Sequence, residues 1–255
     1  MTADFNKNSF RPRKNSTNNK IAFLQTDGSE THLYTMNSNG TDVSKITSTI
    51  PIAGFRSDEL DFAWHQNGQR LYYPYLNKLY SITADGTGNN LVYQAAEGTF
   101  ITEIDTNNFN SLILIKTNNS EGYEARIIVI TTAGSEELVV AEGYSGALGG
   151  VSFSIDGSKV LYTRDISGSE NQEYRQLDTR IFEYDSTTNL SVEINTFKPE
   201  GSNDLDVKYS PDNGSIIYMN TSNDGLSQKN IYKYVFNSEL DRELIFSNAF
   251  MPDWE

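Results

Sequence analysis

Residues 151–163, VSFSIDGSKVLYT, carry the pattern that decides the fold. An aromatic-ended apolar run, Val151–Phe153, is followed by a turn that contains Asp156 and Gly157, and a second run of β-branched and aromatic residues comes next. Aspartate and glycine are residues that tight turns prefer, and alternating β-branched and aromatic residues favour strands. The stretch therefore predicts two antiparallel strands joined by a short turn.

The same hairpin pattern recurs along the chain, once in a degenerate form. Its other copies are DFAWHQNGQRLYYP (61–74), TEIDTNNFNSLILIK (102–116) and DVKYSPDNGSIIYM (206–219). A second kind of hairpin occurs five times, four of them after a copy of the first: HLYTMNSNGTDVSKI (32–46), KLYSITADGTGNNLV (78–92), RIIVITTAGSEELVV (126–140), RIFEYDSTTNLSVEI (180–194) and NIYKYVFNSELDREL (230–244). The anchors of this second kind recur every 46 to 54 residues, a period typical of propeller blades. We therefore expect an all-β, five-bladed β-propeller, with six blades as the alternative.

The first kind of hairpin has four complete copies, while the second kind has five. Residues 249–255, AFMPDWE, match the first strand of the first kind of hairpin, with Trp254 at the aromatic position. Residues 19–26, NKIAFLQT, match the second strand of that hairpin. An array of blades that cannot bury their faces alone must close on itself. We therefore expect the fifth unit to be split between the two chain ends and closed by strand exchange.

Residues 1–18 lack apolar periodicity. Lys7, Arg11, Arg13 and Lys14 lie here against the single acid Asp4. A polar, charged segment of this kind cannot bury enough apolar surface to fold alone. The predicted organisation is thus a flexible leader over 1–18 and one propeller domain over 19–255.

Three motif-bearing segments resemble a known family. Phe153–Asp165 (FSIDGSKVLYTRD), Tyr209–Tyr218 (YSPDNGSIIY) and Pro252–Trp254 (PDW) are similar to the WD-repeat-like propeller repeats of the TolB type. The resemblance covers roughly residues 19–255. It implies the propeller fold, a periplasmic, cell-envelope or extracellular bacterial setting, and a docking function in place of catalysis.

Charge and composition exclude several function classes. The net charge of −14 would repel nucleic-acid phosphates and anionic lipid surfaces. The absence of cysteine excludes disulfides and thiolate metal sites, and no apolar run is long enough to span a bilayer. His32 and His65 stand in no metal-binding spacing. We expect a monomer with no cofactor, no metal, no nucleic-acid partner and no membrane insertion.

Acidic residues precede several of the expected inner strands. They are Asp58, Glu59, Asp61, Glu103, Asp204 and Asp206. Paired carboxylates with separated pKa values perform glycoside hydrolysis. A glycoside hydrolase or other carbohydrate-active enzyme using Asp61, Glu103 and Asp206 is therefore the alternative function.

The loops of the chain favour a binding function over the enzymatic alternative. The longest, Arg164–Arg180 (RDISGSENQEYRQLDTR), interrupts the repeat period, and long loops on a rigid scaffold often carry binding sites. The candidate binding residues are Phe55, Arg56, Tyr75, Tyr123, Arg164, Tyr174 and Arg175, because tyrosine and arginine are frequent interface anchors. We expect a non-catalytic scaffold of the bacterial cell envelope that docks a protein or a glycan on the channel-opening face.

Overall fold

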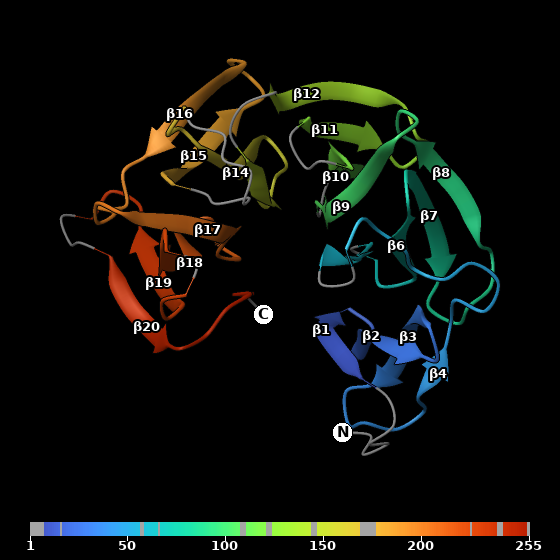
Figure 1. Cartoon of the computed structure of the whole chain (residues 1–255). Coiled ribbons are helices and arrows are strands. Elements are labelled where there is room, and N and C mark those ends of the chain that lie inside the picture. The colour runs from blue at the N-terminus through green and yellow to red at the C-terminus, as the bar shows by residue number, and fades with distance from the viewer. Residues whose placement is uncertain are drawn as a thin grey trace. The chain divides into compact units, whose positions relative to one another are not determined.

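The computed structural model describes residues 8–253 except 16, 57–58, 66, 108–110, 121–123, 144–146, 169–176, 225 and 239–241. The described residues form five antiparallel sheets of four strands each, and the fold is a five-bladed β-propeller (Figure 1). The prediction of five blades is confirmed.

Each blade uses its strands in chain order from one edge of the sheet to the other. Blade I contains β1 (Ser9–Asn15), β2 (Lys20–Asp27), β3 (Glu30–Asn37) and β4 (Ser44–Lys45). Blade II contains β5 (Ala63–Trp64), β6 (Arg70–Tyr75), β7 (Lys78–Thr83) and β8 (Asn90–Gln94). Blade III contains β9 (Thr99–Thr106), β10 (Leu112–Asn119), β11 (Ala125–Thr131) and β12 (Glu136–Gly143). Blade IV contains β13 (Leu148–Phe153), β14 (Lys159–Asp165), β15 (Thr179–Asp185) and β16 (Leu190–Ile194). Blade V contains β17 (Ser202–Tyr209), β18 (Ser215–Ser222), β19 (Asn230–Val235) and β20 (Glu243–Ser247).

The chain divides into two compact units. Unit 1 comprises residues 1–120 and 130–136, and unit 2 comprises residues 121–129 and 137–255. Blades I and II belong to unit 1, blades IV and V belong to unit 2, and blade III contributes strands to both.

Both kinds of predicted hairpin are present. The second kind forms β3–β4, β7–β8, β11–β12, β15–β16 and β19–β20, and the first kind forms β5–β6, β9–β10, β13–β14 and β17–β18. The turn between β11 and β12 requires a glycine. Gly134 has a φ of +88°, and a Cβ there would lie 1.9 Å from the carbonyl oxygen of Val92. No other residue fits at this position because the neighbouring backbone occupies the space.

Apolar cores lie between neighbouring blades. In unit 1, Leu24 and Leu33 of blade I pack in one cluster with Leu71 and Tyr73 of blade II. In unit 2, a cluster joins blade IV to blade V; its buried members are Leu161, Ile181, Val207, Tyr209, Ile216 and Tyr218. Blades I and II in unit 1, and blades IV and V in unit 2, thus bury apolar side chains against each other.

A cross-strand aromatic pair recurs between the second and third strands of four blades. The stacked pairs are Phe23–Tyr34, Tyr73–Tyr80, Tyr162–Phe182 and Tyr218–Tyr232, with ring centroids 5.6, 5.8, 5.5 and 6.2 Å apart. Pairs of this kind contribute about 0.5–1.5 kcal/mol each beyond their buried area. They explain why aromatic residues recur at the repeat positions seen in the sequence.

The first blade is completed differently from the prediction. Residues 9–15, assigned to a flexible leader by their composition, form β1 and pair antiparallel with β2. Because β2 has β1 on one edge and β3 on the other, it has no edge for residues 249–255 to occupy. The predicted strand exchange is therefore wrong at β2. Residues 249–253 form no strand, and Trp254 lies outside the described residues.

Long-range contacts explain why a basic segment becomes a strand. Phe10 packs against the apolar cluster of blades I and II, and the indole Nε1 of Trp64 donates a hydrogen bond of 3.0 Å to the carbonyl oxygen of Arg13. Arg13 Nη2 lies 2.9 Å from Asp61 Oδ1. Two of the charges that suggested a solvated leader, Arg11 and Arg13, are thus paired with Asp61 at the start of blade II.

This arrangement makes the stability of the protein depend on β1. We expect removal of residues 1–15 to lower the free energy of unfolding by at least about 3 kcal/mol, because a core strand is lost and the Asp61 carboxylate is left buried without its arginines. Urea denaturation measures the effect. Removal of residues 1–7 alone is the comparison, and an equal midpoint for both truncations would contradict the assignment of β1.

Candidate functional site

Asp61 and Glu103, two of the proposed catalytic acids, are engaged in unit 1. Asp61 is only 4% exposed. Its Oδ1 lies 2.9 Å from Arg13 Nη2 and 3.4 Å from Arg11 Nη1, and its Oδ2 accepts a 2.9 Å hydrogen bond from the backbone N–H of Ile104. Glu103 Oε1 lies 3.0 Å from Lys116 Nζ on the adjacent strand. Asp61 therefore links the inner strands of three blades, which is a structural task.

Asp206, the third proposed acid, lies in unit 2. It has a φ of +53° and lies at the irregularity of β17 between Leu205 and Lys208. Arg11 in β1 (φ +49°) and Gly150 in β13 (φ +62°) lie at the matching irregularities of their blades. Asp206 thus marks a repeated backbone feature. Glu59 lies 3.5 Å from Arg56, and Asp58 is outside the described residues.

Three predicted binding residues, Phe55, Arg56 and Tyr75, lie in unit 1. Ala53 forms a parallel bridge with Tyr75, so the loop that carries Phe55 and Arg56 runs beside the turn between β6 and β7. The ring of Phe55 lies 5.6 Å from that of Phe100. In unit 2, Arg164 Nη2 donates a 2.8 Å hydrogen bond to the carbonyl oxygen of Glu142. Tyr123, Tyr174 and Arg175 lie outside the described residues.

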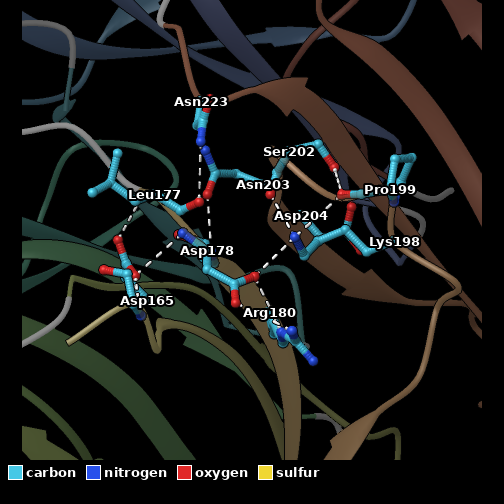
Figure 2. Close-up of polar contacts among 12 residues, drawn as sticks. Asp165, Leu177, Asp178, Arg180, Lys198, Pro199, Ser202, Asn203, Asp204 and Asn223 are labelled. Carbon is cyan, nitrogen blue, oxygen red and sulfur yellow. Dashed lines mark hydrogen bonds and ion pairs between the residues drawn. The ribbon is translucent and has the colours of Figure 1, made fainter. Parts of the chain in front are cut away.

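Unit 2 contains a set of joined loops that the sequence did not reveal (Figure 2). We define the loop network by its described residues: 165–168 and 177–178 of the first loop, 195–201 of the second, and 222–224 with 226–229 of the third. Asp165 Oδ1 and Oδ2 accept hydrogen bonds of 2.8 Å from the backbone N–H groups of Ser167 and Leu177. The backbone N–H of Asn223 donates a 2.9 Å hydrogen bond to Gly201, and its side-chain Nδ2 lies 3.4 Å from the carbonyl oxygen of Leu177. The three loops are therefore held together.

Charged side chains add to the loop network. Asp178 Oδ1 lies 2.9 Å from Lys198 Nζ, and Asp178 Oδ2 lies 3.1 Å from Arg180 Nη2, as Figure 2 shows. Arg180 Nη1 lies 2.8 Å from Glu193. Hydrogen bonding to Arg180, followed by that to Lys198, lowers the pKa of Asp178. Beside these groups lies a cleft of about 90 Å³, lined by Arg180 and residues 193–198.

Large apolar side chains are exposed on all three loops. Ile166 belongs to the first, Phe197 to the second and Leu226 to the third, and Leu226 is 92% exposed. Phe197 has a φ of +54°, a conformation that bulky residues rarely adopt and that often marks functional sites. Exposed apolar groups on loops held by hydrogen bonds are what a docking surface requires.

The buried carboxylate of Asp204 anchors loop 195–201. Asp204 is fully buried, and its Oδ2 accepts a 2.5 Å hydrogen bond from Thr196 Oγ1 while its Oδ1 accepts one of 2.7 Å from Asn220 Nδ2. Arg242 Nη1 lies 3.7 Å from the carboxylate. Desolvation outweighs the hydrogen bonds and raises the pKa of Asp204.

Metal ligands do not gather in the described part of the chain. No group of three or more histidine, cysteine, aspartate or glutamate side chains there could hold a metal ion. His32, which stands in no metal-binding spacing, is buried, and its Nδ1 lies 2.6 Å from the carbonyl oxygen of Thr47. Among the described residues, no helix has the length and apolar character needed to cross a membrane.

The raised pKa of Asp204 predicts a dependence of stability on pH. The folded protein holds the proton of the Asp204 carboxyl group more tightly than the unfolded chain does. The contribution of this group to the free energy of unfolding is therefore complete below the ordinary pKa of 3.8 and is lost as pH rises through the higher pKa of the folded state. We expect Asp204→Asn to remove this loss, so that the free energy of unfolding of the variant rises relative to the parent as pH increases above 3.8. Urea denaturation at a series of pH values measures it.

Asp212 in the same blade supplies a control of opposite sign. Hydrogen bonds from Ser210 and Gly214 lower its pKa, so its contribution is present above 3.8 and is lost as pH falls through the lower folded value. The Asp212→Asn variant should therefore differ from the parent in its pH dependence only below 3.8. A constant difference between Asp204→Asn and the parent at all pH values would contradict the role given to Asp204.

No protein-family model and no curated protein matches the chain. Solved structures do match. An oligogalacturonate lyase in complex with manganese has a TM-score of 0.67 and 15% identity over 95% of this chain and 67% of the lyase. A protein from Agrobacterium tumefaciens assigned as TolB has a TM-score of 0.68 and 12% identity over 97% of this chain and 86% of its own. TolB from Acinetobacter baumannii has a TM-score of 0.64 and 15% identity over 96% of this chain and 56% of its own.

These identities are low, so the matches bear on the fold. The chain spans about two thirds of the length of the lyase and just over half of the Acinetobacter protein. The resemblance inferred from the repeat motifs and the matches to two TolB structures agree. The chain has a TolB-like β-propeller fold.

Proposed function

We propose that the protein is a non-catalytic binding scaffold that docks a protein or a glycan through the loop network of unit 2. The observation that carries the proposal is the combination of exposed apolar side chains with fixed loops: Ile166 and Leu226 lie on loops that are hydrogen-bonded to Asp165 and Asn223. Loops that are already ordered lose little conformational entropy on binding.

The cell envelope of a bacterium is the proposed setting. It rests on the similarity of the motifs and of the fold to TolB proteins. The proposed surface in unit 1, around Phe55, Arg56 and Tyr75, is a second place where a partner could contact the scaffold. A monomer is sufficient for this function because each unit presents its own loops.

Binding can be tested with matched surface variants. The parent, Ile166→Ser/Leu226→Ser and the control Leu190→Ser/Val192→Ser would be immobilised and exposed to a bacterial envelope extract and to a glycan array. All four substituted side chains are exposed, so the fold should persist. We expect a ligand that the parent and the control retain and that the loop variant loses. Retention by all three proteins, or by none, would contradict the proposal.

The alternative is a carbohydrate-active enzyme that uses Asp61, Glu103 and Asp206. The match to an oligogalacturonate lyase favours it. Against it, the carboxylate of Asp61 is already engaged by Arg11 and Arg13, and that of Glu103 by Lys116, so these oxygens serve contacts within the protein.

Turnover distinguishes the alternative from the scaffold. We expect the parent, incubated with oligogalacturonate and Mn²⁺, to release neither new reducing ends nor unsaturated products detectable by ultraviolet absorbance. Turnover by the parent that is lost in Glu103→Gln, with the fold intact by circular dichroism, would establish the enzyme in place of the scaffold.

A further inference from the structure

The cleft beside the loop network is small and polar. Its volume of about 90 Å³ holds roughly three water molecules. It is lined by Arg180 of β15 and by residues 193–198, which run from the end of β16 into loop 195–201. A ligand can therefore insert only one edge or one substituent here, while the rest of it contacts the exposed side chains around the cleft.

Charge balance at the cleft restricts the ligand. Arg180 is paired with Asp178 and Glu193, and Lys198 is paired with Asp178. Figure 2 shows Asp178 between the two cations. An anion would compete with these carboxylates for the same cations, and a cation would compete with Arg180 for Glu193. The protein's net charge of −14 further opposes an anionic ligand.

An apolar ligand is equally unsuitable. It would remove water from the Arg180 and Glu193 side chains without replacing their hydrogen bonds, which costs free energy. The remaining class is a neutral ligand whose groups both donate and accept hydrogen bonds. Hydroxyl groups do both. Arg180 can donate to such groups, and Glu193 can accept from them.

Phe197 supplies an aromatic surface at the edge of the cleft. It is 51% exposed and adopts a φ of +54°. Its backbone N–H donates a 3.0 Å hydrogen bond to Asn195 Oδ1, and the preceding residue, Thr196, is anchored on the buried Asp204. The backbone that carries the ring is thus held at two points. An exposed ring on a fixed backbone offers a flat apolar surface at little entropic cost.

We propose that this cleft is a subsite for a neutral sugar residue of a glycan. The flat C–H face of the sugar stacks on Phe197, and the hydroxyl groups of one edge replace the water molecules of the cleft and form hydrogen bonds with Arg180 and Glu193. This inference rests on the proposed scaffold function, and it narrows the ligand to uncharged carbohydrate.

Titration calorimetry with defined hexasaccharides tests the subsite. The probes are cellohexaose, maltohexaose, xylohexaose and mannohexaose, with a hexamer of galacturonic acid as the anionic comparison. We expect at least one neutral probe to bind, and Phe197→Ala to weaken it by about tenfold, which corresponds to the loss of one aromatic contact. Leu190→Ala, which alters a side chain that is 63% exposed on β16, is the control and should bind as the parent does.

Salt provides a second readout. Binding of an uncharged sugar should change little when NaCl is raised from low to high concentration, whereas binding of the galacturonate hexamer to cations would weaken. The proposal is overturned if the neutral probes fail to bind the parent, if Phe197→Ala binds them unchanged, or if the anionic hexamer binds more tightly than every neutral probe.

These outcomes are distinct from failure of the scaffold function. A parent that retains an envelope protein through Ile166 and Leu226 but binds no neutral sugar would overturn the subsite and leave the scaffold intact. A parent that binds neither a protein nor a glycan would overturn both.

Discussion

Packing of one blade's face against the next is the interaction on which the rest of the structure depends. A four-stranded sheet presents apolar side chains on both faces, and it cannot bury them alone. In unit 1, Leu33 and Tyr73 belong to one shared cluster, and in unit 2, Leu161 and Tyr218 do. The recurrence of stacked aromatic pairs follows from this requirement, because each pair lies at the same two strands of its blade.

The proposed functional surface follows from the rigidity that this packing creates. Loops that begin and end on buried strands can be fixed by a few polar residues, such as Asp165 and Asn223, which hydrogen-bond to the backbone of other loop residues. Asp204 extends this rigidity inward, because it is fully buried and accepts the hydrogen bond of Thr196. Desolvation of Asp204 destabilises the folded protein at neutral pH, and its hydrogen bond with Thr196 fixes loop 195–201.

The hairpins and the number of blades could be predicted because both depend on local pattern. Turn residues such as Asp156 and Gly157 and strand aromatics such as Tyr162 belong to the repeated pattern, and neither requires knowledge of distant residues. The origin of the first strand could not be predicted in this way. Residues 9–15 look solvated by composition, and only the contacts of Arg13 with Asp61 and Trp64, about 50 residues further along the chain, make them a strand.

The sequence by itself determined the all-β class and the five blades, because these follow from the spacing and composition of the repeat. It also placed candidate residues on loops. Only the tertiary structure decided that Asp61 is a cross-link between blades, and that Asp178, Arg180 and Lys198 meet beside Phe197. The physical reason is that the role of a charged side chain depends on which groups it contacts in the folded protein, and these groups come from segments that are separated in the sequence.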